Sequence, residues 1–406
     1  MAEVTQAHTD RAHAKLSPSA SHRWMHCPGS IRLSEGIDKG SSVYADEGTS
    51  AHELAAECLR TGREPAEFLG KWVNIDAEYE AHRFSHDKPD TGRSFEVDEE
   101  MVDGVGLYVD YVRSLDVDGA ELDIEFRFDL QHVAEGMFGT GDAVVYNPAT
   151  RHLHVADFKY GRGVPVEPAE NSQLLAYGLG AVKRHHNRGL DGVTLTVVQP
   201  RCRHPKGPIR EWTTDAIGLL DFEHDLRTAA EATAQPDAPL KAGEWCKFCP
   251  AAATCEENRG HALKIAAMEF EDPGFDLATV LGEVGHVTAW AKRVLEYAHD
   301  QAMAGNVPKG WKLVEKRAIR RWKDESTVAA TLSTVYELED HEIWAPQELA
   351  TPAQVEKHMP GKNKEQRAAA LRDLVVKQSS GSVLVPEHDV RAPVRGDGSE
   401  FLEAAE

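Results

Sequence analysis

The segment HLHVADFKYG, residues 152–161, decides the fold of this chain, because it presents charged side chains where a buried strand should end. Its first half has the apolar pattern of a strand, and Asp157 and Lys159 follow two positions apart. Side chains alternate along a strand, so these two groups lie on the same face. A solvated strand end and a catalytic site both explain the pattern, and the neighbouring segments have to decide between them.

The neighbouring segments predict an α/β core. Residues 121–130, ELDIEFRFDL, alternate with a period of two, and residues 137–148, MFGTGDAVVYNP, follow at short spacing. Together with residues 152–161 they predict a three-stranded antiparallel meander. Residues 171–186 then predict a helix and residues 193–201 a further strand. We therefore expect a mixed central sheet flanked by helices.

Helical segments surround this core. Ser50 with Glu53 three residues later matches a capping box, which predicts a helix over residues 51–60. A short helix is expected to end at the Cys27-Pro28-Gly29 turn. The other predicted helical segments are 63–118, 214–235 and 277–303.

Length and charge narrow the class of protein. The 406 residues allow two or three domains, and the net charge of −22 argues against a protein that coats nucleic acid through a broad basic surface. A local basic channel in an enzyme remains compatible with that charge. We expect no membrane-spanning helix, because no run of 18 apolar residues occurs. The opening MAEVTQAHTDRAHAK lacks the apolar region of a secretion signal, so we expect a cytoplasmic protein.

Asp142, Asp157 and Lys159 form the first candidate constellation. Two consecutive antiparallel strands place the two carboxylates side by side, where they can share a hard cation such as Mg²⁺ or Mn²⁺. Lys159 can orient the attacking water and offset charge on a phosphate. The alternative for each residue alone is a charged group at a wet strand end.

Three further polar residues are candidates for the same site. His52, early in its predicted helix, offers an imidazole ligand for Mn²⁺, and a satisfied helix histidine is the alternative. Gln173 and Tyr177 lie four residues apart on one helix face. They could bind a DNA phosphate or the lysine, and a solvent-facing stripe is the alternative.

The cysteines indicate a metal centre. Of the six cysteines, Cys246, Cys249 and Cys255 lie within ten residues, and a disulfide framework is not expected in a cytoplasmic chain of this length. Cys27 is the best candidate for a fourth ligand, with His22, His26 or His261 as substitutes in a zinc version. Thiolate ligation fits either a 4Fe-4S cluster or Zn²⁺. Cys58 and Cys202 are interpreted as incidental thiols.

The ordered set of motifs resembles the PD-(D/E)XK nuclease superfamily, and most of all its RecB-type branch. The motifs are Gly48-Thr49-x-x-His52, Gly139-x-Gly141-Asp142, Asp157-Phe158-Lys159 and Gln173-x3-Tyr177. The cysteine pattern is similar to the iron–sulfur staple of AddB-type and CRISPR-associated adaptation nucleases. The segment LSPSASHRWMHCPGSIRLSE also resembles the start of an uncharacterised phage-encoded family within this superfamily. The resemblance covers residues 16–260.

This resemblance implies a restriction-endonuclease-like fold and a metal-dependent DNA exonuclease serving phage recombination, replication or repair. It implies metal ligation by His52, Asp142, Asp157 and the Phe158 carbonyl, with Lys159 catalytic and Gln173 and Tyr177 as auxiliary polar residues. Glu125 matches an accessory acid loosely. The proline usual before the first acid is replaced by Gly141. No GxxxxGK[ST] phosphate loop occurs, so we expect no helicase within this chain.

Two domains and a set of partners follow from this interpretation. Residues 1–260 would be the nuclease domain, closed by the four cysteines, and residues 261–406 an accessory region that is mainly helical or α+β. DNA is the expected partner, and a phage single-strand annealing or single-strand-binding protein is a candidate second partner. Basic and aromatic residues could grip a strand by charge and stacking, or form a solvated face: Lys309, Trp311, Lys312, Arg317, Arg320, Arg321 and Trp322. A catalytically silent nucleic-acid-binding module and a zinc-stapled interaction module are the competing hypotheses.

Overall fold

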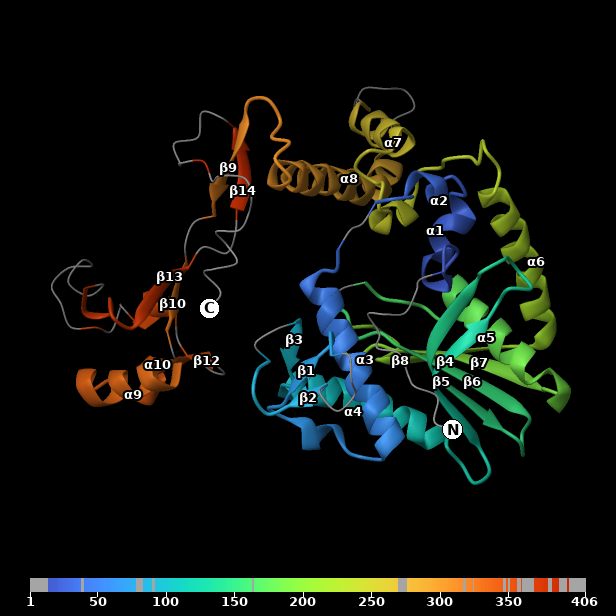
Figure 1. Ribbon diagram of the computed structural model, residues 1–406, viewed down its shortest axis with the longest axis horizontal. Coiled ribbons are helices and arrows are strands. Elements are labelled where there is room, and N and C mark those ends of the chain that lie inside the picture. Colours follow the sequence, from blue (N-terminus) through green and yellow to red (C-terminus); the bar gives the residue numbers. More distant parts are fainter. Residues whose placement is uncertain are drawn as a thin grey trace. The chain divides into compact units, whose positions relative to one another are not determined.

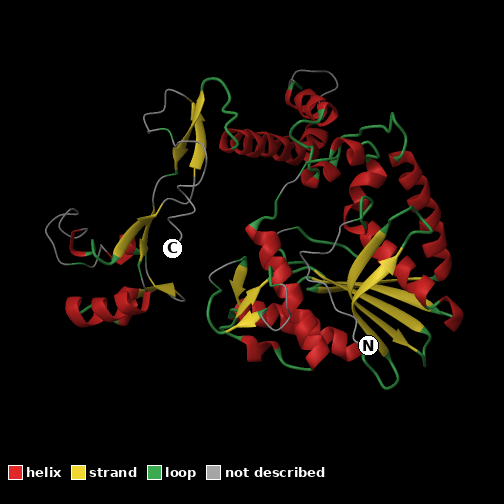
Figure 2. Ribbon diagram, in the orientation of Figure 1, coloured by secondary structure: helices red, strands yellow, loops and turns green. Residues whose placement is uncertain are grey.

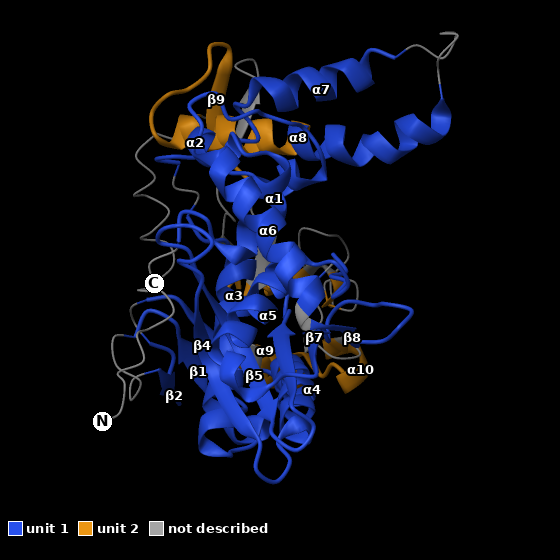
Figure 3. Ribbon diagram, turned by 90° about the vertical axis from the view of Figure 1, so that its right-hand side faces the viewer, with its two compact units in different colours: residues 1–290 blue, residues 291–406 orange. Residues whose placement is uncertain are grey.

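A computed structural model gives the fold of two compact units, residues 1–290 and residues 291–406, and each unit is described by itself (Figure 3). The division follows residue 290, whereas the sequence predicted a domain boundary after residue 260. The structure describes residues 14–37, 40–77, 83–89, 92–162, 164–268, 276–316, 319–323, 325–345, 348–349, 351–355, 359, 369–378, 382–386 and 393.

A five-stranded mixed sheet with the order β4-β5-β6-β7-β8 is the centre of the first unit (Figure 1). The predicted meander is confirmed, with β4 (Glu121–Asp129), β5 (Phe138–Asn147) and β6 (His152–Phe158) pairing antiparallel. β7 (Gly192–Val198) then returns parallel to β6. The sequence analysis did not predict the outer strand β8 (Ile209–Thr214), which pairs antiparallel with β7.

Helices cover both faces of this sheet, as the predicted α/β class requires (Figures 1 and 2). Along β5, Val144 and Tyr146 pack into one buried cluster with α5 (Ser172–Arg184) and α6 (Ala216–Thr233). Ala143 and Val145 face the other way, into a cluster with α3 (Val43–Thr61) and α4 (Glu99–Leu115). The side chains of one strand, which point alternately to either face of the sheet, therefore contribute to two separate hydrophobic cores.

The helix that carries His52 is longer than predicted. α3 begins at Val43, where the Ser42 side chain accepts a hydrogen bond from the Ala45 amide. The predicted start at residue 51 and its capping box are wrong, because the Ser50 hydroxyl donates to the Asp46 carbonyl inside the helix. Glu53 instead forms a buried ion pair with Arg83.

The segment 63–118 is only partly helical, which corrects the prediction. A 3₁₀ turn, η3 (Pro65–Phe68), leads into a small antiparallel sheet of order β2-β1-β3. Its strands are short: β1 (Trp72–Asn74), β2 (Phe84–Ser85) and β3 (Ser94–Glu96). Only α4 follows as a helix, and the Asp98 side chain caps it by accepting from the Met101 amide.

The first unit is completed by short elements around the chain ends of the core. The predicted short helix is α1 (Ser21–His26), preceded by η2 (Pro18–Ala20) and followed by α2 (Ser30–Leu33). After α5 comes η5 (His186–Arg188), and after α6 come η6 (Glu244–Phe248) and α7 (Glu256–Ala266).

The predicted long helix is present as α8 (Leu277–Met303), and it continues from the first unit into the second. The described part of the second unit includes the strand pairs β9 (Trp311–Glu315) with β14 (Ser382–Pro386) and β10 (Ile319–Trp322) with β13 (Val375–Gln378), and a third pair joins β11 to β12. Its other elements are α9 (Glu325–Tyr336), α10 (Asp340–Ile343), β11 (Trp344–Ala345), β12 (Glu348–Leu349) and α11 (Pro352–Val355).

Among the helices that the structure describes, none combines the length and the hydropathy needed to cross a bilayer.

Packing against Phe128 explains why a glycine, Gly141, directly precedes Asp142. A Cβ on Gly141 would lie 2.6 Å from the Phe128 ring, and one on Gly180 of α5 would lie 2.7 Å from it. Phe128 also stacks on Tyr177 with ring centroids 5.2 Å apart. The two glycines therefore leave room for the ring that holds β4 and β5 against α5.

Gly141→Ala should lower the free energy of unfolding by about 1–3 kcal/mol, because the added methyl overpacks against the buried Phe128 ring. Chemical denaturation measures the change. Gly106→Ala in α4 is the matched control, since a Cβ there meets open space, and helix propensity should make it neutral or stabilising by up to about 1 kcal/mol. Equal effects of the two substitutions would contradict the packing explanation.

Candidate metal-dependent active site

The two predicted aspartates lie opposite each other where β5 and β6 stop pairing. Ala143 and Ala156 form the last antiparallel pair, and the next positions in that register are Asp142 and Asp157. The Asp142 carboxylate continues the ladder, because its Oδ2 accepts a hydrogen bond from the Phe158 amide at 2.6 Å. Asp142 is thus held by the backbone of the strand that carries Asp157.

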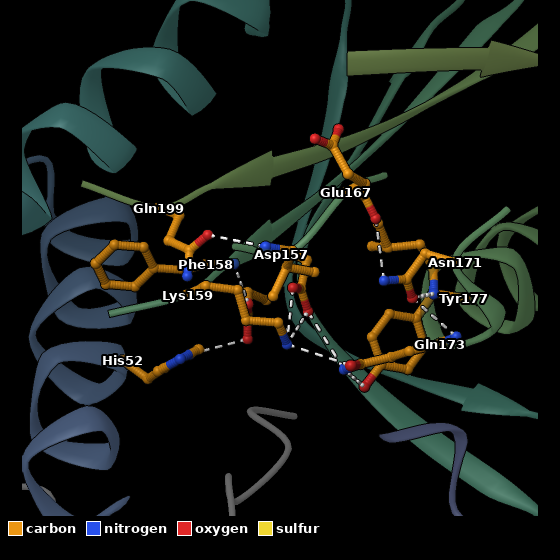
Figure 4. A network of polar contacts seen from close by, with 12 residues as sticks. His52, Asp157, Phe158, Lys159, Glu167, Asn171, Gln173, Tyr177 and Gln199 are labelled. Atoms are coloured by element: carbon orange, nitrogen blue, oxygen red, sulfur yellow. Dashed lines mark hydrogen bonds and ion pairs between the residues drawn. The ribbon is translucent and has the colours of Figure 1, made fainter. Parts of the chain in front are cut away.

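Asp157 and Lys159 form an ion pair in which the aspartate is buried and the lysine partly exposed (Figure 4). The Lys159 Nζ lies 2.8 Å from Asp157 Oδ2 and donates to Oδ1 at 3.2 Å. The Asp157 side chain is only 4% exposed. Burial raises the pKa of Asp157, against the lowering effect of the Lys159 charge. Burial alone would lower the pKa of Lys159, but the Asp157 carboxylate outweighs it and raises that pKa.

The His52 side chain points from α3 toward this network of polar contacts (Figure 4). Its Nδ1 lies 3.0 Å from Asp142 Oδ1, so both oxygens of Asp142 are engaged by described residues. Burial disfavours the charged imidazolium, but the Asp142 and Glu125 carboxylates prevail and raise the pKa of His52 to about 9. The site therefore attracts positive charge at this position.

Gln173 and Tyr177 extend the polar network along α5. Asn171 caps this helix by accepting from the Gln173 and Leu174 amides, which fixes its first turn near β6. Gln173 Oε1 accepts from Lys159 Nζ at 3.2 Å, and its Nε2 donates to the Tyr177 hydroxyl at 2.9 Å. The structure thus joins Asp157, Lys159, Gln173 and Tyr177 in one hydrogen-bonded chain.

Glu125 is more central than the sequence analysis indicated. It lies on β4 opposite Asp142, and its φ of 52° is in the left-handed region that residues other than glycine rarely adopt. Ligand atoms of His52, Glu125 and Asp142 lie within 4.8 Å of one another. Backbone strain of this kind concentrates at functional sites, and no sequence pattern reveals it.

A cavity of about 310 Å³ opens onto these residues. Asp142, Asp157, Lys159, Gln173 and Tyr177 line it together with His52. Its rim includes residues that the sequence analysis gave no role at the site: Ser17, Pro18, Ser19, Thr49, Phe138 and Thr140. The site is therefore large enough to admit a ligand beside the ion pair.

The four predicted cysteines come from both ends of the first unit and gather near one another. Cys27 ends α1, and Cys255 directly precedes α7. Burial, helped by the neighbouring thiols of Cys249, Cys27 and Cys255, raises the pKa of Cys246 to about 11. The Cys27 Sγ accepts a hydrogen bond from the Lys241 amide at 3.3 Å. No three of these four described sulfurs lie within 4.8 Å of one another.

The backbone approaches closely beside Cys27. The Gly29 amide donates to the Pro239 carbonyl at 2.9 Å, and a Cβ on Gly29 would lie 2.5 Å from the Ala238 carbonyl oxygen. The chain before α2 therefore lies directly against the chain after α6. Cys58 and Cys202 are both buried.

The predicted nucleic-acid-binding residues lie in the second unit. Trp311 and Lys312 are on β9, with Trp311 40% exposed, and Lys309 is exposed just before the strand. Arg320 and Arg321 are on β10, where Trp322 packs partly against a buried cluster. Arg317 lies outside the described residues.

Mn²⁺ should raise the Tm of the protein, because an ion bound by the native site at 100 times its Kd contributes about 2.7 kcal/mol of stability. Asp142→Asn should remove most of that shift, and differential scanning calorimetry measures it. The matched control is Asp129→Asn, an exposed aspartate at the end of β4. Identical shifts in both variants would argue against a metal at Asp142.

Comparison with known proteins adds a family and two structures. The crystal structure of SSO0001 matches with 16% identity and a TM-score of 0.28, over 61% of this chain and 90% of the other. That of a phage related exonuclease from Haemophilus somnus 129PT matches with 14% identity and a TM-score of 0.22, over 55% and 94%. The family model described as "Protein of unknown function (DUF2800)" matches residues 13–392, so the chain belongs to that family.

Proposed function

We propose that this protein is a metal-dependent nuclease that hydrolyses phosphodiester bonds of DNA. The observation that carries the proposal is the ion pair of the buried Asp157 with Lys159, hydrogen-bonded to Gln173 beside the potential metal ligands His52, Glu125 and Asp142. A buried charged network facing an open cavity costs stability and is typical of catalytic sites. The resemblance of the ordered motifs to the PD-(D/E)XK superfamily, and to its RecB-type branch, supports the same function.

The donor set fits Mg²⁺ or Mn²⁺. Carboxylates of Asp142, Asp157 and Glu125 and the imidazole of His52 are ligands that suit these ions, with Mn²⁺ tolerating the nitrogen. Asp157 Oδ2 is buried and accepts no hydrogen bond from the described residues, although Lys159 Nζ lies nearby. The Phe158 carbonyl is proposed as a further ligand. When bound, the ion would polarise the phosphate and lower the pKa of a water molecule.

Lys159 is proposed to act on the reacting phosphate. Its ammonium group has three N–H donors, and the described residues engage two of them, through Asp157 and Gln173. The third is available to a phosphate oxygen or to the attacking water. Gln173, steadied by the Tyr177 hydroxyl, fixes the direction of the ammonium group. Charge that develops on the phosphate would thus meet a donor already in place.

We propose an exonuclease acting on DNA in phage recombination, replication or repair, within the host cytoplasm. A phage single-strand annealing or single-strand-binding protein is the proposed protein partner. Lys309, Lys312 and Trp311 are proposed to hold a strand by charge and stacking, together with Arg317, Arg320, Arg321 and Trp322.

Lys159→Met should reduce the rate of DNA cleavage at least about 100-fold, because it removes a preplaced donor to the reacting phosphate. Gln173 Nε2 still lies 3.4 Å from Asp157 Oδ1, so circular dichroism should show a folded variant. The assay uses linear DNA labelled at the 5′ or the 3′ end, with Mg²⁺ or Mn²⁺. Lys183→Met, at the exposed end of α5, is the matched control and should retain full activity.

Three results of this assay separate the hypotheses. Loss of cleavage in Lys159→Met but not in Lys183→Met supports the nuclease. Equal cleavage by both variants and the wild type assigns the activity to another site or to a contaminant. DNA binding without cleavage under either metal ion favours the catalytically silent binding module.

We propose that Cys27, Cys246, Cys249 and Cys255 hold a 4Fe-4S cluster that fastens α1 to the segment after α6. Two sulfurs bound to a single zinc ion lie at most about 4.6 Å apart, whereas no three of these described sulfurs are that close together. In a 4Fe-4S cluster each cysteine binds a different iron, so the four sulfurs need not lie that close together. Zn²⁺ bound by the same thiolates is the alternative.

Protein purified without oxygen should be brown and contain about four irons per chain if a 4Fe-4S cluster is present. Cys246→Ser should bleach it and lower its Tm, because the link between the two chain segments is lost. Cys202→Ser is the matched control, since this cysteine is not one of the four. Colourless protein that contains zinc would contradict the 4Fe-4S cluster and support Zn²⁺ bound by the same four cysteines.

A further inference from the structure

A second group of ligating side chains lies on α7 and α8, away from the cavity of the proposed nuclease. His261 is on α7, and Glu283 and His286 follow three residues apart on α8. Their ligand atoms lie within 4.8 Å of one another. None of the three lines the cavity around Asp157. The group therefore requires an explanation of its own.

The spacing of this group suits one small cation. His261 Nε2 lies 3.0 Å from Glu283 Oε2. Two ligands about 2 Å from one tetrahedral ion lie about 3.3 Å apart, which is close to that separation. The rings of His261 and His286 meet edge to face, with centroids 4.8 Å apart. His261 is 29% and Glu283 37% exposed, so an ion from solution can reach them.

The second histidine is oriented as metal-binding histidines are. The Gly243 backbone lies beside the His286 ring and favours its protonation. The ring Nε2 is buried and has no hydrogen-bond partner in the described residues. A backbone carbonyl on one ring nitrogen fixes the tautomer and leaves the lone pair of the other for a metal. A buried nitrogen without a partner is costly in a site with no ligand.

We propose that His261, Glu283 and His286 bind a transition-metal dication, with Zn²⁺ as the expected ion. Two imidazoles and one carboxylate are a donor set that zinc prefers, and they leave a fourth position for water. The ion would join α7 to α8. It would also join both helices to Gly243, whose carbonyl accepts from the Cys246 amide at 2.9 Å. The bound ion would thus stabilise the segment from Gly243 to Cys249, which carries two of the four cysteines.

Cobalt and zinc binding by the full chain test the proposal. The protein is stripped with a chelator and titrated with Co²⁺ and then Zn²⁺, comparing the wild type with His261→Gln, Glu283→Gln and His286→Gln. The wild type should bind one more equivalent than each variant, and the difference between their spectra should show d–d bands without sulfur-to-cobalt charge transfer. Loss of a ligand should weaken Zn²⁺ binding at least about 100-fold, since loss of an outer partner alone costs 10–100-fold.

His224→Gln is the matched control, because this histidine is exposed on α6, and it should bind as the wild type does. Three separate variants keep the test valid if one fails to fold, which circular dichroism detects. Equal metal stoichiometry and equal cobalt spectra in all five proteins would overturn the proposal and leave a histidine–glutamate hydrogen bond. DNA cleavage assayed in the same variants should be retained, so the two proposals fail independently.

Discussion

The ion pair between the buried Asp157 and the partly exposed Lys159 is the constraint on which the architecture of the first unit depends. Withdrawing the Asp157 charge from water costs several kcal/mol, and its attraction to Lys159 offsets this only when the remaining hydrogen-bonding capacity is satisfied. Gln173 supplies that hydrogen bonding, and its helix must therefore start close to the end of β6. The Asn171 cap sets that start. The hydrogen bonding that the ion pair needs thus fixes where α5 begins and which of its faces lies toward β6.

Packing around Phe128 also requires α5 to lie close to the sheet. Its ring lies between two glycines and against Tyr177, so the helix that carries Gln173 can come within contact of β4 and β5. Larger residues at Gly141 or Gly180 would push that helix outward, and the hydrogen bonds to the ion pair would lengthen. Close packing and buried charge are therefore satisfied by a single arrangement of α5, and neither is independent of the other.

The sequence predicted the elements whose pattern is local and missed those that depend on distant contacts. The meander and α5 have clear periodicity, and Asp142, Asp157, Lys159 and Gln173 meet as their motifs indicate. The start of α3 was misplaced because a serine and a glutamate three apart imitate a cap, while Glu53 is in fact paired with a distant arginine. The prominence of Glu125 arises from a backbone angle, which residue types do not encode.

The close approach of Gly29 to Pro239 has a consequence for how the chain folds. The two residues are far apart in sequence, yet the entropy of closing a loop rises by only about 0.6 kcal/mol for each doubling of its length. The free-energy cost of closing this loop is therefore modest. The contact nevertheless lowers the folding rate, because contacts between distant residues form slowly. During synthesis, the segment that follows α1 can make this contact only after the chain has been made as far as Pro239. Ser17 and Ser19, at the rim of the cavity, precede that helix. Formation of the complete site around Asp157 would then be among the last events of folding.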